Sequence, residues 1–157
     1  EYSTNTSKIL RQSVITNYQF NSFFISANLA FNLIKYIRLT DNYRWAISQS
    51  KAGNYINTIR NVSNETSLDM TFLPDKLLLN TTLQYTHNSG FTDRKDYTFM
   101  TLSITFKPSK KVQLVLNFDN IFNTDTFVYR SNNNLTEGYT LYQLRPRCVM
   151  LTTHFAL

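Results

Sequence analysis

Cysteine is almost missing from this chain of 157 residues. Its one cysteine, Cys148, excludes an intrachain disulfide and any zinc site built from several cysteines. The two histidines, His87 and His154, are far apart and lack the spacing of a local metal motif. We therefore expect no metal site and no cofactor.

Glycine, proline and charge are also scarce. Three glycines and three prolines exclude collagen-like and low-complexity chains. Charged residues make up 17%, below the roughly 25% of ordinary soluble domains. The apolar residues, 42% of the total, are spread thinly, and no window approaches the roughly 18 apolar residues of a membrane-spanning helix. A helical membrane protein is excluded.

The net charge of +6 raises the question of nucleic-acid binding. The basic residues are scattered along the chain, however, and Arg94-Lys95 stands between two aspartates. A nucleic-acid footprint gathers on one face or one helix. We expect no nucleic-acid partner.

Alternation of apolar and polar residues dominates what is present. Phe23, Ile25, Ala27, Leu29, Phe31 and Leu33, for example, share one face, and Ser26, Asn28, Ala30 and Asn32 share the other. Asp41 interrupts the apolar face of the next segment. The pattern predicts seven strands, at residues 23–33, 39–48, 67–72, 77–86, 99–106, 112–119 and 148–157.

The connections between these strands alternate between short and long. Residues 33–38, 73–76 and 107–111 form short turns, and residues 49–66, 86–96 and 123–140 form long polar loops. All tight turns then lie at one end of the sheet, where the last strand also ends. Transmembrane barrels are built this way, whereas a Greek-key sandwich has no reason to sort its loops.

The expected fold is therefore all-β, an antiparallel up-and-down transmembrane β-barrel over residues 1–157. The inward face is mostly Ser, Thr, Asn and Gln with few charges, which suits a wide lumen that is wet or filled. Aromatic residues near strand ends fit interfacial girdles: Tyr43, Trp45, Tyr85, Tyr97, Phe106, Phe118 and Phe155.

The number of strands is open. Single-chain bacterial barrels have even numbers, so seven strands require at least one more upstream. In the alternative, an eighth strand contains Leu10, Gln12, Val14, Thr16, Tyr18 and Phe20, turns at Asn21-Ser22, and closes a small complete barrel.

Two segments near the end of the chain carry a family resemblance. Leu114-Val115-Leu116-Asn117-Phe118-Asp119-Asn120-Ile121-Phe122-Asn123 resembles the penultimate strand of TonB-dependent outer-membrane receptors. Tyr142-Gln143-Leu144-Arg145-Pro146-Arg147, followed by Val149, Leu151 and Phe155, is similar to the entry into their last strand, in the Bacteroidota form. The chain departs from the family by ending in Leu157 rather than an aromatic residue, and it contains neither the plug nor the TonB-engaging motif.

The resemblance implies the C-terminal part of a barrel of about 22 strands with a plugged lumen, in the outer membrane of a bacterial cell. Such a barrel imports a scarce nutrient such as a metal chelate, glycan or peptide. The implied partners are outer-membrane lipid, the barrel-insertion machinery, TonB through a region outside these residues, and a surface lipoprotein. The chain begins with Glu1 and has no signal peptide, so we expect a processed or partial chain.

No catalytic constellation is evident, and we do not expect an enzyme. The resemblance assigns barrel closure and recognition by the insertion machinery to the last strand, through Val149, Leu151, Phe155 and Leu157. Arg94, Tyr129 and Tyr139 are candidate contacts in the extracellular loops. Two other functions stay open: a non-transporting barrel that serves as adhesin or assembly scaffold, and a soluble carbohydrate-binding β-sandwich.

Overall fold

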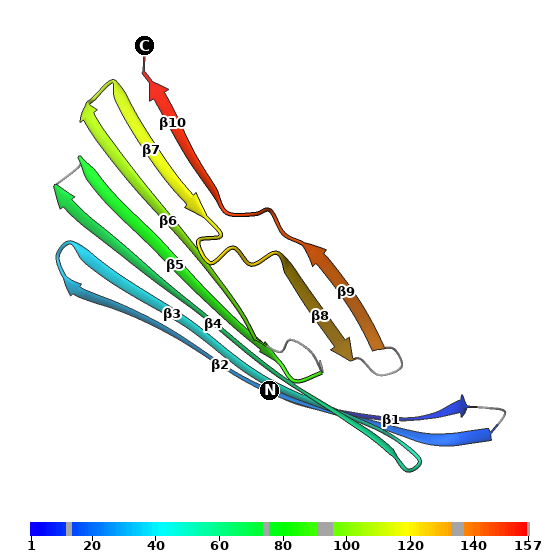
Figure 1. Ribbon diagram of the computed structural model, residues 1–157. Coiled ribbons are helices and arrows are strands. Elements are labelled where there is room, and N and C mark those ends of the chain that lie inside the picture. Colours follow the sequence, from blue (N-terminus) through cyan, green and yellow to red (C-terminus); the bar gives the residue numbers. More distant parts are fainter. Residues whose placement is uncertain (12–13, 74–75, 91–95, 133–136, 157) are drawn as a thin grey trace.

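The computed structural model consists of one large antiparallel sheet and a separate hairpin (Figure 1). It describes residues 1–11, 14–73, 76–90, 96–132 and 137–156, with the side chains of all of these except 10, 11, 14, 129–132 and 137. The main sheet has eight strands in the order β1-β2-β3-β4-β5-β6-β7-β10, and β8 pairs with β9. The strands are β1 (Tyr2–Arg11), β2 (Val14–Ile34), β3 (Ile37–Ala52), β4 (Tyr55–Leu73), β5 (Leu77–Asn88), β6 (Asp96–Ser109), β7 (Val112–Asp119), β8 (Thr126–Asn132), β9 (Glu137–Gln143) and β10 (Cys148–Phe155).

The predicted all-β, up-and-down antiparallel architecture is confirmed, and no helix occurs among the described residues. Neighbouring strands follow each other along the chain from β1 to β7, and β10 then adds to β7. The adjoining ends of β2 and β3, of β4 and β5, and of β6 and β7 lie at the same end of the sheet as the last residues of β10 (Figure 1). The sheet is open, with β1 and β10 as its outer strands.

The register keeps apolar residues opposite apolar residues from strand to strand. Ile104 of β6 pairs with Leu79 of β5 and with Leu116 of β7, and Leu116 pairs in turn with Leu151 of β10. Because side chains alternate between the two faces of a strand, this register gathers the apolar residues on one face and the polar residues on the other. We call these the apolar face and the polar face.

The first two strands correct the prediction for the N-terminal region. β2 runs without interruption through Asn21 and Ser22, which pair with Gln49 and Ser48 of β3. The alternative strand that turned at these two residues is therefore wrong, and the additional strand is β1, which pairs with the first half of β2. Asn-Ser without glycine is a weak turn signal, and ladder pairs on both sides of these residues outweigh it.

The segment 49–66, predicted to be a long loop, is also corrected. It completes β3 and β4, which are joined by the two-residue turn Gly53-Asn54 between the paired residues Ala52 and Tyr55. Gly53 has φ +60°, the backbone form that a tight hairpin of this kind requires at its first central position. The Gly-Asn pair was a usable hairpin signal, but the polar residues around it concealed the strands.

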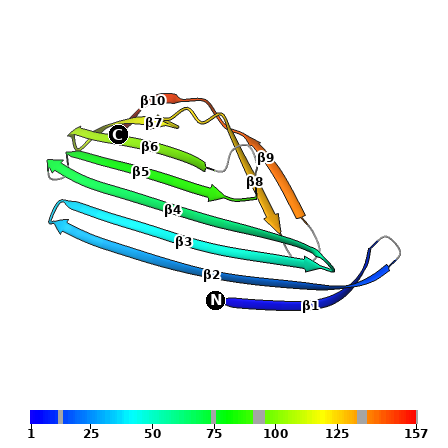
Figure 2. The same ribbon diagram turned by 60° about the horizontal axis from the view of Figure 1, so that its bottom comes forward.

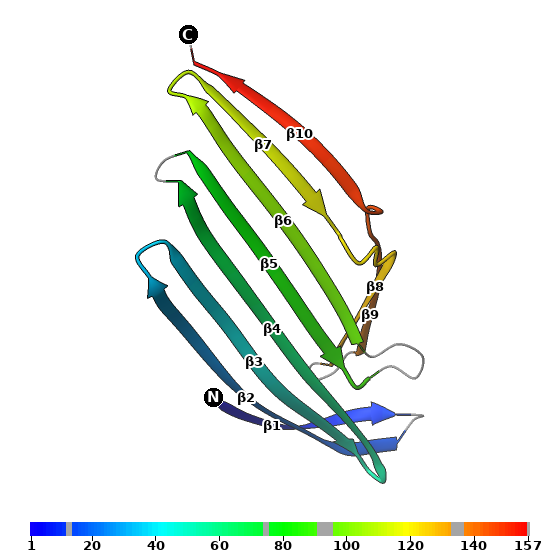
Figure 3. The same cartoon turned by 60° about the vertical axis from the view of Figure 1, so that its left-hand side comes forward.

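The long strands extend the sheet well past its neighbours. β2 has 21 residues, which at about 3.3 Å per residue is about 70 Å. The β1–β2 and β3–β4 hairpins consequently project beyond the other strands at the end opposite the C-terminus (Figure 3). We call this the loop end, and the opposite end the short-turn end.

The distribution of exposure is the reverse of that in a globular domain. Among described side chains, the buried hydrophobic ones are Tyr18, Phe20, Ile59 and Tyr97, and none of these lies on the apolar face between β5 and β10. The apolar face is instead open, with Leu33 62%, Leu151 66% and Phe155 71% exposed. Monomeric soluble proteins rarely leave such a continuous apolar surface uncovered.

The positive φ of Gly53 predicts how its substitutions behave. A Cβ at this position meets Thr16 Cγ2 at 3.5 Å, an ordinary contact, so the cost of a side chain is backbone strain alone. We expect Gly53→Val to reduce the free energy of unfolding by about 1–2 kcal/mol. Asn54→Val at the second central position is the control, because φ is not positive there, and it should cost less than half as much. Denaturant unfolding followed by the fluorescence of Trp45 measures both, and equal losses would contradict the assignment.

Candidate functional site

The polar face carries a ladder of cross-strand hydrogen bonds between β4 and β5. Gln84 Nε2 donates to Glu65 Oε2 at 2.6 Å, the hydroxyls of Ser67 and Thr82 are 3.0 Å apart, and Asn80 donates to Asp69. These three pairs stand directly opposite each other in the register. Cross-strand pairs of this kind stabilise the sheet and hold the polar groups in fixed positions.

Glu65 adds a charge to the polar face that the sequence pattern did not predict. It was assigned to a loop, but it lies on the face where the pattern already placed Asp69 and Arg44. The guanidinium of Arg44 lies over the ring of Phe24, 5.0 Å from its centroid. The prediction missed Glu65 because its strand began at residue 67, whereas β4 begins at Tyr55. A residue can be assigned to a face of the sheet only when it belongs to a strand.

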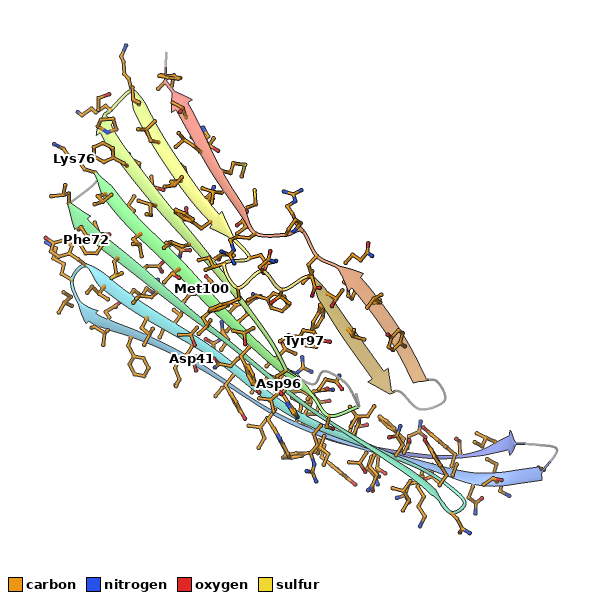
Figure 4. The ribbon with its side chains drawn as sticks, viewed as in Figure 1. Asp41, Phe72, Lys76, Asp96, Tyr97 and Met100 are labelled. Atoms are coloured by element: carbon orange, nitrogen blue, oxygen red, sulfur yellow. The ribbon has the colours of Figure 1, made fainter. Side chains whose placement is uncertain are left out.

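The β8–β9 hairpin packs over the loop end of β6 through aromatic contacts. The ring of Phe127 in β8 meets Tyr97 and Phe99 of β6 edge-on, with centroids 5.0 and 5.8 Å apart, and stacks on Tyr142 of β9 at 6.0 Å. Tyr97 is only 2% exposed and lies beside β8 in Figure 4. Tyr97 therefore anchors the hairpin on the polar face, and its predicted place in an outward aromatic girdle is wrong.

This hairpin occupies most of the segment 123–140 that was predicted to be a polar loop, and it stands outside the main ladder (Figure 2). A signal for it was present in the sequence. Residues 126–129, Thr-Phe-Val-Tyr, and 139–142, Tyr-Thr-Leu-Tyr, are short runs of residues that favour strands. Both runs are shorter than a membrane-spanning strand, and the prediction of long strands therefore did not include them.

Two asparagines bind together the two ends of the chain segment that contains the hairpin. Asn120 and Asn123 have φ of 51° and 55°; Asn120 directly follows β7, and Asn123 is three residues further on. Asn120 Nδ2 donates to the carbonyls of Thr124 and Arg145 at 2.8 Å each, and its Oδ1 accepts from the Thr124 N–H at 2.9 Å. Asn123 Oδ1 accepts from the Arg147 N–H at 2.9 Å. We call this pair the asparagine clamp, because it joins the exit from β7 to the entry into β10.

The clamp gives a physical role to the motif that carried the family resemblance. Asparagine tolerates positive φ better than other residues with a Cβ, and its amide both donates and accepts. Asn120 therefore uses both the backbone tolerance and the donors and acceptor of its amide, whereas Asn123 uses the backbone tolerance and its acceptor alone.

A cavity of about 920 Å³ lies on the polar face beneath the hairpin. The residues that define its chemistry are Asn28, Asn42, Arg44, Glu65, Gln84 and Phe127. This volume is in the range of small-molecule sites, and amide groups beside an aromatic ring can bind a hydroxylated or amide-bearing ligand.

The apolar face also contains polar groups, paired between strands. Asp41 of β3 accepts hydrogen bonds from Thr66 Oγ1 at 2.6 Å and Asn64 Nδ2 at 2.9 Å, both from β4. Nearer the loop end, Asp96 Oδ1 accepts from the Tyr85 hydroxyl at 2.5 Å and lies 2.7 Å from His87 Nδ1. Figure 4 shows Asp41 in the middle of the sheet and Asp96 towards the loop end. Local pairing lowers the cost of polar groups on an otherwise apolar surface.

The predicted site residues fall into two regions. Val149, Leu151 and Phe155 of β10 are exposed on the apolar face, as expected, while Leu157 lies outside the described residues. Arg94 also lies outside them, and Tyr129 belongs to β8 with an undescribed side chain. Tyr139 is 67% exposed in β9, so it sits on a hairpin strand rather than in a loop.

The described part of the chain holds no group of three or more His, Cys, Asp or Glu side chains placed to bind a metal ion. No helix there is long and apolar enough to span a membrane. Cys148 and His154, both of β10, lie on the polar face.

The asparagine clamp predicts a pair of matched variants. Asn120→Asp keeps the acceptor and tolerates positive φ, but it loses both donors and turns a carboxylate towards two carbonyls. We expect opening of β8–β9 to become easier by about 1–3 kcal/mol, measured by amide hydrogen exchange within the hairpin. Asn123→Asp keeps its single acceptor role and should leave exchange unchanged. Equal effects of the two variants would show that the amide donors of Asn120 are unimportant.

No protein-family model, no curated protein and no solved structure matches this chain. The geometry of the two faces and the residue patterns are the grounds on which a function can be proposed.

Proposed function

We propose that this chain is part of the wall of an outer-membrane β-barrel, and that the barrel serves TonB-dependent uptake of a nutrient. The observation that carries the membrane part is the apolar face, which spans strands β2 to β10 and is covered by no other layer among the described residues. Hydrocarbon lipid is the environment in which such a face is stable. Backbone groups inside the sheet are satisfied by the ladders, as a membrane requires.

Four further features support a barrel wall. The strands that span the apolar face reach or exceed the roughly 9–11 residues of a tilted membrane strand in most cases, and the short turns share one end. Tyr43, Tyr85 and Trp45 lie on the apolar face towards the loop end, where an interfacial girdle belongs. The free edges of β1 and β10 suit a wall that continues beyond these eight strands.

The transport part rests on the family resemblance and on the polar face. The asparagine clamp coincides with the motif of residues 114–123, and the cavity beneath the hairpin offers a place for cargo on the lumen side of the wall. Energy coupling through TonB would require a plug and a coupling motif outside these residues. β10 would pair with the first strand of the barrel to close it, and it would be recognised by the insertion machinery.

A second function is favoured by one specific observation. The β1–β2 and β3–β4 hairpins project beyond the rest of the sheet at the loop end, as the binding surface of an adhesin or scaffold would (Figure 3). This arrangement needs no transport and is compatible with a small barrel of eight strands.

Cysteine labelling tests the orientation of the two faces. Leu116 and Asn117 are adjacent in β7 and point to the apolar and polar faces respectively. In a Cys148→Ser background reconstituted in lipid vesicles, we expect Asn117→Cys to react with a water-soluble maleimide at least about tenfold faster than Leu116→Cys, since lipid excludes the reagent. Similar rates in the two variants, or protein that fails to float with the vesicles, would contradict a membrane wall.

The apparent mass in SDS separates the two functions. Folded barrels resist SDS until heated, so we expect the native protein to give a heat-shifted band far above the 18.4 kDa of this chain. A heat-shifted band near 18.4 kDa would instead mean a small barrel and favour the adhesin or scaffold. Absence of any heat-shifted band would contradict both.

A further inference from the structure

The short-turn end of the sheet concentrates positive charge. Five lysines lie in or beside the strand ends here: Lys35, Lys76, Lys107, Lys110 and Lys111. The nearest described acid, Asp69, is hydrogen-bonded to Asn80 on the polar face. Asp75, next to Lys76 in sequence, lies outside the described residues. Even when its charge is counted, the lysines at this end outnumber the aspartates. We call the five residues the lysine collar.

Backbone contacts hold part of the collar together. Lys107 N–H donates to the Lys76 carbonyl at 2.7 Å, which joins the β4–β5 turn to the end of β6. Ala156 N–H donates to the Lys111 carbonyl at 2.9 Å, which joins the β6–β7 turn to the end of β10. Between these elements lies a cavity of about 810 Å³, lined among others by Lys76, Lys107, Lys110, Lys111, His154 and Phe155. Four lysines thus contribute to the lining of one cavity, and their positive charges favour an anion there.

The collar directly borders the apolar face. Large apolar side chains at this end are strongly exposed, among them Ile34, Phe72, Leu73, Phe106 and Phe155. The Lys35 ammonium lies 5.3 Å from the centroid of the Tyr36 ring, and Figure 4 shows Phe72 and Lys76 at the same end of the sheet. A free anion or an acidic peptide would use the ammonium groups but leave the apolar rim uncovered. An amphiphile with an acyl chain and a phosphate matches both.

We propose that the lysine collar binds the headgroups of anionic phospholipids in the leaflet that faces the short turns. The inference rests on the proposed membrane location and adds a partner to it. Lysine stems lie along the apolar rim while their ammonium groups reach the phosphates, and each such residue adds to the attraction of an anionic surface. The attraction is ionic and should weaken as salt is raised.

The test compares matched sets of exposed cations at the two ends of the sheet. Lys76, Lys110 and Lys111 of the collar are replaced by Gln in one variant, and Lys8, Lys51 and Arg60 of the loop end in the other; all six are exposed. The full-length protein is reconstituted in phosphatidylcholine vesicles with about one-third phosphatidylglycerol, extracted in mild detergent, and analysed by native mass spectrometry for retained lipid. The measured quantity is the ratio of retained phosphatidylglycerol to phosphatidylcholine.

We expect the unaltered protein to enrich phosphatidylglycerol, and the collar variant to lower the ratio by about fivefold or more. The loop-end variant and a collar variant with Arg at the same three positions should keep it. Absence of enrichment, equal loss in both Gln variants, or displacement of the lipid by excess inorganic phosphate would overturn the proposal. Flotation and the heat-shifted band are scored on the same samples. Protein that floats without lipid preference sinks this inference alone, whereas protein that does not float sinks the membrane proposal itself.

Discussion

The structure depends above all on a strand register that pairs the apolar-face residues of each strand with the apolar-face residues of the next. Phe118 of β7 faces Leu102 on one side and Val149 on the other, and each belongs to the apolar set of its own strand. A slip of one residue in any pair would turn that strand's apolar side chains to the polar face. The three register irregularities, at Asn32/Ile34, Thr71/Leu73 and Phe106/Ser109, all adjoin short turns. They therefore occur where a strand is ending and alter no ladder beyond them.

With this register, a polar side chain on the apolar face must find its hydrogen-bond partners on the adjacent strand. Asp41 would present an unpartnered carboxylate between Leu39 and Tyr43, but its neighbours across β4, Thr66 and Asn64, are both donors. Asp96 is likewise held by Tyr85 and His87 of the adjacent strand. The strand next to each of these polar groups supplies its hydrogen bonds. The rest of the face can therefore stay apolar, and no second layer of protein is needed to satisfy the carboxylates.

The connection from β7 to β10 links the sheet to the candidate site. A chain leaving β7 must run out into β8–β9 and return beside its starting point, because β10 pairs with β7 over eight residues. The clamp of Asn120 and Asn123 fixes that return, and Phe127 fixes the hairpin against β6. The asparagine clamp and the contacts of Phe127 together hold the hairpin over the sheet, and this arrangement forms the cavity on the polar face.

The sequence by itself determined the all-β class, the two faces, the short turns and the direction of the last strand. These follow from alternation and from turn residues, which are local properties. Only the tertiary structure decided that residues 49–66 extend two strands, that Tyr97 is covered by a hairpin, and that Glu65 faces Gln84. Polar strands such as the outer part of β4 have no hydrophobic pattern, and are strands because neighbours supply their hydrogen bonds. The asparagine clamp and the lysine collar join residues that are distant in sequence, so only the pairing of β10 with β7 and of β5 with β6 brings them together.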